Sequence, residues 1–395
     1  MNPRSAALSR GCRPLTRADS GTKDRVANFV LVSRGRVGPR CTTTRFRERR
    51  CVCRRVLGKG GQSPMTVSTA TFASGVRALE FVRSVDRRLL HRRALSEVFL
   101  TDTVAVDGQR FLAGAQLPSS HAYFTDHVGH TVVDPILLLE CARQAETCGA
   151  HTHLGVDGDT KFVLQSWSMR LPGLFAAHSG DPAELTVEVT TDRPADATTP
   201  ARSVTYGMRF LLSGEEAGEA RMTVGYLSSG TYSFVRSKRR GSPPVSSDDV
   251  TTLPATVAPA DLGRVNPVNA LLVDPVRDGE GISAGVRIPN DNPSMFDHAQ
   301  DHLPGMVLTE AARQAALLAG ARLLGRPAHE TTLVGFDLGF AKFAELDAPT
   351  TVDVVPEGEN GAIRTFRTTF RQNGDEVASG TVETTAVPAS HRSTR

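Results

Sequence analysis

Two stretches of the chain repeat one pattern: Leu139-Glu140-Cys141-Ala142-Arg143-Gln144-Ala145 and Thr309-Glu310-Ala311-Ala312-Arg313-Gln314-Ala315. Each places a glutamate three residues before an arginine inside an apolar run, so on a helix the two side chains share one face and can meet. Burying such a pair removes hydration that the mutual attraction often does not recover. A pair kept twice despite this penalty marks both a structural repeat and a candidate functional site.

The repeat extends upstream of the two glutamates. Val98–His127 and Asn269–His298 have the same length and align without a gap, and both end in an Asp-His pair. Both contain an Asp-Gly dipeptide, Asp107-Gly108 or Asp278-Gly279, which supplies the positive φ of a tight hairpin turn. Similarity on this scale indicates a tandem duplication.

A central helix is predicted in each copy. Asp134 can accept the free amide hydrogens of a first helical turn, and Pro135 suits the first helical position. The second helix is expected from about Met306 to Leu324, where Gly325 and then Pro327 end it. Both helices are apolar on nearly every side, so other elements must surround them.

After each helix, apolar and polar residues alternate between turns that contain glycine and aspartate. This pattern predicts antiparallel strands with one polar face. A long antiparallel sheet wrapped around one central helix is the hotdog fold, so the predicted fold class is α+β, a tandem (double) hotdog that forms a pseudo-dimer within one chain. The predicted strands cover residues 162–167, 185–189, 204–212 and 220–226 in the first copy and 332–335, 351–355, 364–371 and 380–385 in the second.

Charge is distributed unevenly along the 395 residues. Residues 1–64 contain 16 Lys and Arg against 3 Asp and Glu, whereas the remainder contains 30 against 39. The basic segment has three interpretations: a nucleic-acid-binding arm, a transit peptide, or sequence upstream of a translation start at Met65. We favour the third, assign the segment no function and expect no nucleic-acid partner.

The predicted domain organisation follows from the repeat. Arg236–Arg240 begins a stretch that we interpret as a solvated connector rather than a contact for an acidic carrier protein. The boundaries are a basic extension at 1–64, a first hotdog repeat at 65–235, a linker at 236–260, a second hotdog repeat at 261–388 and a tail at 389–395.

Cysteine usage and hydropathy indicate the compartment. Four of the six cysteines precede residue 64, which leaves Cys141 and Cys148 on one predicted helix. That is too few for a secreted disulfide framework, so a reducing cytoplasm is expected. No run approaches the ~18 apolar residues that a membrane span needs, so no membrane association is predicted.

The repeated pair and the nearby histidines form the candidate site. Apolar surroundings raise the pKa of a carboxylate toward neutrality, which suits a general base, and an arginine offers a planar fork to phosphate or to a developing oxyanion. The structural alternative is an internal ion pair, with Gln144 and Gln314 bonding backbone groups. His127 and His298 precede the two helices and His302 follows in the second copy, so an imidazole can approach the same cleft.

The start of the second helix resembles a known enzyme signature. Leu303–Glu310 is similar to the Pro-Gly-Val-Leu-x-x-Glu motif of hotdog β-hydroxyacyl-carrier-protein dehydratases. The positions that hold the catalytic histidine in those enzymes are Phe296 and Asp126 here. The dehydratase pairing is therefore not reproduced, which argues against simple dehydration.

The pattern more closely resembles the A-factor biosynthesis (AfsA-like) family, which makes precursors of γ-butyrolactone-type signals in mycelial actinobacteria. The resemblance covers about residues 90 to 385, and the doubled Ala-Arg-Gln-Ala in one chain is fairly specific to it. Its motifs here are Glu97-Val-Phe-Leu100, Asp126-His127, Asp134-Pro135, Glu140-x-x-Arg143-Gln144-Ala145, Asp297-His298, Asp301-His302, Pro304-Gly305-Met306 and Glu310-x-x-Arg313-Gln314-Ala315.

The resemblance implies transfer of a β-ketoacyl group from an acyl carrier protein thioester to the hydroxyl of dihydroxyacetone phosphate, on the way to a butyrolactone, butenolide or furan signal. Such thioester alcoholysis needs a base, an oxyanion donor, a cationic group for the phosphate and an apolar tunnel for the acyl chain. Neither a metal nor a cofactor is implied. The protein is expected to be a monomeric pseudo-dimer or a homodimer.

The second copy is expected to carry the main chemistry. Glu310 is the candidate base, Arg313 the phosphate or oxyanion group, and His298 or His302 an accessory donor. Glu140 in the first copy completes or mirrors the site. Further substrate-binding candidates are Arg143, Asp297, His127 and Gly305, the last because glycine permits close backbone approach at a helix N-terminus.

Two alternative functions remain open. A hotdog thioesterase or dehydratase would act on the same carrier-bound acyl chain without a phosphate acceptor. A non-catalytic regulator would bind an acyl chain or a signal without turnover.

Overall fold

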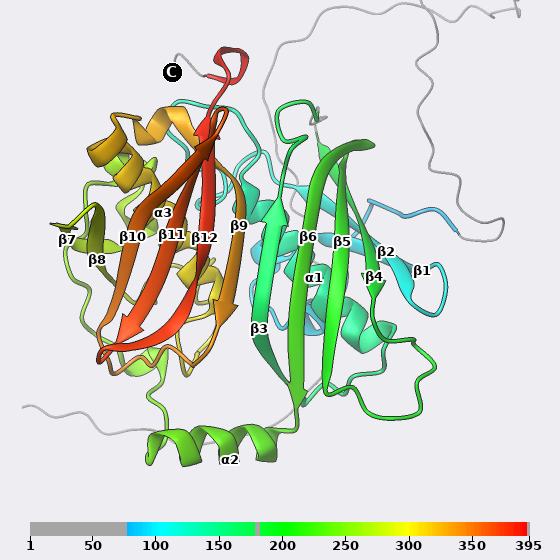
Figure 1. Ribbon diagram of the computed structural model, residues 1–395. Coiled ribbons are helices and arrows are strands. Elements are labelled where there is room, and N and C mark those ends of the chain that lie inside the picture. Colours follow the sequence, from blue (N-terminus) through cyan, green and yellow to red (C-terminus); the bar gives the residue numbers. More distant parts are fainter. Residues whose placement is uncertain (1–76, 178–181, 393–395) are drawn as a thin grey trace, which may run out of the picture. The chain divides into compact units, whose positions relative to one another are not determined.

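The computed structural model describes residues 77–177 and 182–392 as one continuous antiparallel sheet with two long helices on one of its faces (Figure 1). The predictions made for residues 1–64 lie outside these described residues. The strand order is β1-β2-β4-β5-β6-β3-β9-β12-β11-β10-β8-β7, so the second half repeats the first in reverse across the β3–β9 pair. The predicted tandem hotdog fold is confirmed.

The predicted strands are all present, with longer bounds than their alternation indicated. The first half contains β1 (Leu100–Ala105), β2 (Arg110–Leu117), β3 (Lys161–Arg170), β4 (Ala183–Thr191), β5 (Ser203–Leu212) and β6 (Glu215–Leu227). The second half contains β7 (Leu272–Asp278), β8 (Gly281–Val286), β9 (Thr331–Phe340), β10 (Thr350–Asn360), β11 (Ile363–Gln372) and β12 (Asp375–Ala386). Short 3₁₀ helices occupy Arg87–Leu90, Leu95–Glu97, Ser247–Asp249, Pro259–Leu262, Pro267–Asn269, Ala328–Glu330 and Ala389–His391.

The predicted start of the first central helix is confirmed, and the second helix matches its predicted bounds to within one residue. Helix α1 (Pro135–Thr152) is capped by the Asp134 carboxylate, which accepts a hydrogen bond from the Ile136 amide. Helix α3 (Gly305–Leu324) ends at Gly325, whose φ of 64° places it in the left-handed region. Most residues of both helices are buried, as their apolar composition requires.

The two hairpin turns differ in one detail. Gly279 has the predicted positive φ, at 56°, but Gly108 does not. The first turn is held instead by the Asp107 carboxylate, which accepts a hydrogen bond from the Gln109 amide at 2.9 Å. The positive φ predicted for Gly108 is therefore wrong, because a side-chain acceptor closes that turn.

The segment interpreted as a solvated connector is in part a packed helix. Helix α2 (Ser229–Arg240) begins within the predicted first repeat and ends within the predicted linker. Arg236 is 2% exposed, donates to Glu345 at 2.6 Å and lies over the Phe343 ring at 4.3 Å. The solvated interpretation is wrong for Arg236, because its partners lie at least 65 residues away in the chain and leave no local signal.

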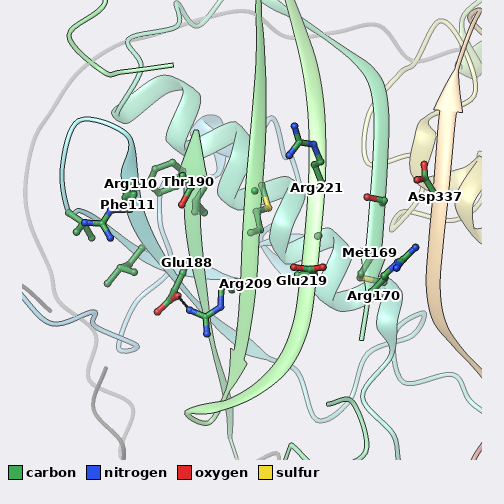
Figure 2. Close-up of a pocket in the computed structure, with 17 residues that line it drawn as sticks. Arg110, Phe111, Met169, Arg170, Glu188, Thr190, Arg209, Glu219, Arg221 and Asp337 are labelled. Carbon is green, nitrogen blue, oxygen red and sulfur yellow. Dashed lines mark hydrogen bonds and ion pairs between the residues drawn. The ribbon is translucent and has the colours of Figure 1, made fainter. Parts of the chain in front are cut away.

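The outer face of the sheet is polar, as the alternation predicts. A groove of about 650 Å³ lies on this face, and Figure 2 shows Arg209 beside Glu188 at this groove. Arg209 pairs with Glu188 at 2.6 Å and also with Glu216 at 2.8 Å. Within the described residues, no helix is long and apolar enough to span a membrane. Cys141 and Cys148 are buried free thiols on α1.

Gly218, in the last strand of the first repeat, lies where the β6 backbone closely approaches β3. A Cβ at Gly218 would overlap the carbonyl oxygen of Arg170, whereas a Cβ at Gly207 would meet nothing closer than the Thr190 oxygen at 3.9 Å. We expect Gly218→Ala to lower the free energy of unfolding by about 1–3 kcal/mol and Gly207→Ala to change it far less. Urea unfolding measures both, and equal effects would contradict this account.

Candidate active site

Each repeat buries a glutamate among three donors. Glu140 is 1% exposed and accepts hydrogen bonds from Arg143 at 2.7 and 2.8 Å and from Arg92 at 2.5 Å. The side-chain amide of Gln144 donates to the same carboxylate at 2.7 Å. Charge-assisted bonds of this kind are the strongest in proteins, so they fix the carboxylate and both guanidinium groups.

The second repeat reproduces this arrangement around Glu310. Arg264 donates to Glu310 at 2.9 Å, Arg313 forms an ion pair with it at 2.5 Å, and Gln314 donates at 2.6 Å. The Tyr123 hydroxyl adds a bond at 3.0 Å from the first repeat. Glu310 is completely buried.

Gln144 and Gln314 link each glutamate cluster by hydrogen bonds to the backbone near the start of the first strand of its repeat. Gln144 donates to the Glu97 carbonyl at 2.7 Å and accepts from the Phe99 amide at 3.0 Å. Gln314 bonds the Asn269 carbonyl and the Leu271 amide in the same way. This confirms that the glutamines bond backbone groups, as the structural alternative required.

Arg92 and Arg264 were not identified from the sequence, although they occupy equivalent places. Arg92 lies six residues before Val98, whereas Arg264 lies five residues before Asn269. The gapless alignment starts at Val98 and Asn269 and therefore does not extend to them. An alignment allowing one gap upstream would have paired the two arginines.

One cavity of about 260 Å³ lies between α1 and the start of α3. Arg143 lines it from α1, and His298, His302 and Gly305 line it from the second repeat. Its walls also include apolar and aromatic side chains from β3, β6 and β9: Phe162, Leu164, Trp167, Met222, Val224 and Phe340. An apolar cavity with a few convergent polar groups is typical of a small-molecule site.

His302 is held in a defined orientation at this cavity. Its Nδ1 lies 2.6 Å from the Asp301 carboxylate, which also accepts from the Tyr232 hydroxyl of α2 at 2.8 Å. Because an ionised carboxylate can only accept, Nδ1 carries the proton and Nε2 is left as an acceptor. Burial would raise the pKa of Asp301, but the hydrogen bonds from His302 and Tyr232 and the charge of Arg236 hold it below its usual value, so Asp301 remains ionised. Helix α2 thus helps to position His302.

His298 differs from His302 because its Nε2 already has a hydrogen-bond partner within the protein. Its Nε2 lies 2.9 Å from the Gln300 side-chain amide, and burial lowers its pKa. The preceding Asp297 carboxylate accepts from the amides of Arg93 and Ala94 and so anchors the loop that carries Arg92. Asp297 is therefore a structural anchor beside the cavity.

The N-terminus of α3 faces the cavity without a side-chain cap. Pro304 is the capping residue and has no side-chain acceptor, and the described residues provide no acceptor for the Gly305 and Met306 amides. Free amides at a helix N-terminus attract anions and carbonyl oxygens. A Cβ at Gly305 would overlap the end of the Leu164 side chain, so a larger residue here would displace a side chain of the cavity wall.

The equivalent place in the other half is closed by the protein itself. Asp134 occupies the position of Pro304, and its Oδ1 accepts from the Ile136 amide at 2.8 Å and from Arg313 at 2.7 Å. His127 lies 3.3 Å from the other oxygen. Only about 10 Å³ of space remains beside this cluster. An internal carboxylate thus fills this place, which we call the closed half-site. The cavity at the start of α3 is the open half-site.

The two repeated glutamates differ in ionisation. Burial alone would raise the pKa of Glu140, but Arg143 and Arg92 outweigh it and lower the pKa to about 2. Burial raises the pKa of Glu310 to about 7, because the negative charge of Asp134 offsets part of the stabilisation by Arg264. The expectation of a near-neutral pKa is therefore wrong for Glu140, whose two arginines keep it ionised.

The sequence-based candidates thus separate into two groups. The cavity brings together Arg143, His298, His302 and Gly305, with Glu140 and Asp297 directly behind them. Glu310, Arg313 and His127 lie in the closed cluster. The cavity also exposes a group that the sequence analysis missed, Glu146.

A tandem hotdog with an apolar cavity at the junction of its two halves defines the class of this protein. The model of the A-factor biosynthesis (AfsA) hotdog domain matches residues 74–228 and 245–388. The chain therefore belongs to the A-factor biosynthesis hotdog family.

Curated relatives cover most of the chain. A 2-oxo-3-(phosphooxy)propyl 3-oxoalkanoate synthase from Streptomyces virginiae is 33% identical over 298 residues, which is 75% of this chain and 96% of the relative. A synthase of the same name from Streptomyces griseus is 29% identical over 310 residues, 76% of this chain and 95% of the relative. Among solved structures, the dehydratase-cyclase domain of ambruticin biosynthesis is similar at 20% identity and a TM-score of 0.41, covering 74% of this chain and 96% of that one.

The buried pair Glu140–Arg143 generates a stability prediction. We expect Glu140→Gln to lower the free energy of unfolding at pH 7 by about 3–5 kcal/mol, because it leaves two buried guanidinium groups without their carboxylate. Because folding depresses the pKa of Glu140, its contribution is complete above the unfolded value near 4.5 and is lost as the pH falls toward about 2. The acid limb of the stability profile should therefore be flatter in the variant.

Glu188→Gln is the control for this prediction. Glu188 forms a half-exposed pair with Arg209, and we expect its loss to change the unfolding free energy by less than about 1 kcal/mol. Denaturant unfolding between pH 3 and 8 measures both variants. Similar small effects would show that the Glu140 cluster does not stabilise the fold.

Proposed function

We propose that this protein is an acyltransferase of the 2-oxo-3-(phosphooxy)propyl 3-oxoalkanoate synthase type. It moves a β-ketoacyl group from an acyl carrier protein thioester to the hydroxyl of dihydroxyacetone phosphate, in the biosynthesis of a γ-butyrolactone-type signal or a related butenolide or furan. The observation that carries the proposal is the cavity, which combines an apolar wall, an oriented histidine and an arginine with a free guanidinium edge in a member of this family.

His302 is the proposed base, in place of Glu310. Its Nε2 takes the proton of the acceptor hydroxyl while Asp301 stabilises the imidazolium that forms. The hydroxyl oxygen attacks the thioester carbonyl carbon, the tetrahedral intermediate expels the carrier thiolate, and His302 returns the proton to that sulfur. Glu310 lies outside the cavity, enclosed by Arg264, Arg313 and Tyr123.

Two neighbouring groups at the cavity are candidate partners for the anionic oxygens of the reaction. The amides of Gly305 and Met306 point from the start of α3 and suit the developing oxyanion. Arg143 donates from its Nε and Nη2 to Glu140. No acceptor in the described residues pairs with its Nη1, so this nitrogen can donate to a phosphate oxygen. Glu140 and Arg92 therefore act as positioning residues for Arg143.

The closed half-site supports this assignment. There Asp134 places one carboxylate oxygen on a first-turn amide and on Arg313, the counterpart of Arg143. Applying the pseudo-symmetry to the open half puts an anionic oxygen between the Met306 amide and Arg143. The protein thus already contains, in its other half, the kind of contact proposed for the substrate.

The activity itself is tested by mass spectrometry of the products. Purified protein is incubated with a 3-oxoacyl-carrier-protein, with and without dihydroxyacetone phosphate. We expect the phosphorylated keto ester only when the acceptor is present. Free 3-oxoacid in both reactions would indicate a thioesterase, and tight binding without turnover would indicate a regulator.

A pair of variants distinguishes the two candidate bases. We expect His302→Gln to lower kcat by about 10²–10⁴-fold with little change in melting temperature, because it removes the proton acceptor but fits the same space. We expect Glu310→Gln to lower the melting temperature while kcat stays within a few-fold of wild type. Loss of turnover in Glu310→Gln with retention in His302→Gln would return the role of base to Glu310.

A further inference from the structure

Glu146 lies one helical turn beyond Arg143 on α1 and lines the same cavity. Its side chain is 2% exposed, and each of its oxygens is held by one hydroxyl group. The Tyr226 hydroxyl donates to Oε1 at 2.7 Å. The Thr147 hydroxyl lies 2.9 Å from Oε2 and 2.9 Å from the Arg143 carbonyl oxygen, so these two acceptors share its single proton. The carboxyl group is therefore fixed in place at the cavity wall.

No ion pair of the described residues involves Glu146, in contrast to Glu140. The equivalent position in the second repeat is Ala316, which has no ionisable side chain. The carboxyl group is thus not part of the duplicated structural cluster. A buried acid without a cation is costly to keep unless it meets a partner.

The surroundings of Glu146 restrict what that partner can be. The neighbouring cavity wall from β3 and β6 is apolar: Phe162, Leu164, Met222 and Val224. A saturated acyl chain lying against this wall would offer Glu146 no hydrogen-bonding group. A 3-oxoacyl chain would offer one carbonyl oxygen, which can only accept a hydrogen bond.

We infer that Glu146, in its neutral form, donates a hydrogen bond to the 3-oxo oxygen of the acyl substrate and so selects 3-oxoacyl over saturated acyl thioesters. This inference rests on the proposed acyl transfer at this cavity. Glu146 is then a specificity-determining residue, and Tyr226 and Thr147 are its positioning residues. A site built to bond a polar group rejects an analogue that lacks it, because its own buried group is left unpaired.

The ionisation of Glu146 is consistent with this role. Burial raises its pKa to about 7, opposed in part by Tyr226, Thr147 and Arg143. The Tyr206 hydroxyl lies 2.6 Å from the Tyr226 hydroxyl, and His91 and His298 line the same cavity as Glu146. Since only the protonated acid donates, selectivity for the 3-oxo group should be greatest below pH 7 and should decline as the pH rises above it.

The test compares kcat/KM for a 3-oxoacyl and a saturated acyl thioester of equal length on the same carrier protein, with dihydroxyacetone phosphate as acceptor. In wild type we expect the ratio to fall as the pH rises from 6 to 8.5. In Glu146→Leu we expect the ratio to fall about 10- to 100-fold at pH 6 and to lose its pH dependence. Glu146→Gln keeps an amide donor of the same shape, so its ratio should stay high at all pH values.

A wild-type ratio retained in Glu146→Leu would overturn the inference, as would an unchanged pH dependence in Glu146→Gln. If the leucine variant does not fold, the pH profile of the glutamine variant decides. If no thioester is transferred by wild type, it is the proposed function that fails. Calorimetric binding of 3-oxoacyl and saturated acyl pantetheine amides to wild type and Glu146→Gln then tests Glu146 alone, and equal affinities for the two amides would refute its role.

Discussion

The buried carboxylate at the centre of each repeat, Glu140 or Glu310, is the constraint on which the remaining structure depends. Each joins a central helix to an arginine from the loop before the first strand, and a glutamine one turn later bonds the backbone of the same region. Losing any one partner would leave buried charge or backbone groups unpaired. The clusters therefore fix the helices and the preceding loops together, and the cavity walls with them.

A difference at one position decides which half-site is open. Where the first repeat has Asp134, the second has Pro304, although the following helices start at equivalent residues. Asp134 reaches Arg313 and fills its half-site. Pro304 has no polar side chain, so within the described part of the chain the first α3 amides and one edge of Arg143 have no partner. Duplication thus supplied two similar frames, and one side chain made them unequal.

Much of the fold follows from local patterns, whereas the site depends on contacts between the repeats. Alternation predicted the strands, and Asp134 and Gly325 marked helix ends, because those signals act within a few residues. The sequence also identified Arg143 and His302, but it grouped them with Glu310. Strand β3 pairs with β9 and places the first repeat's helix beside the second repeat's histidines, a juxtaposition that no local pattern encodes. Glu146 was missed because its function requires the cavity, and it has no repeated counterpart.

The charge balance of the two clusters gives the asymmetry a chemical meaning. When ionised, Asp134 and Glu310 match the two guanidinium groups of the closed half, Arg264 and Arg313. The open half places one carboxylate, Glu140, against the guanidinium groups of Arg92 and Arg143. It therefore lacks one negative charge at the place where the closed half has the Asp134 carboxylate. An anionic phosphate, or the oxyanion of a tetrahedral intermediate, would complete the open cluster as Asp134 completes the closed one.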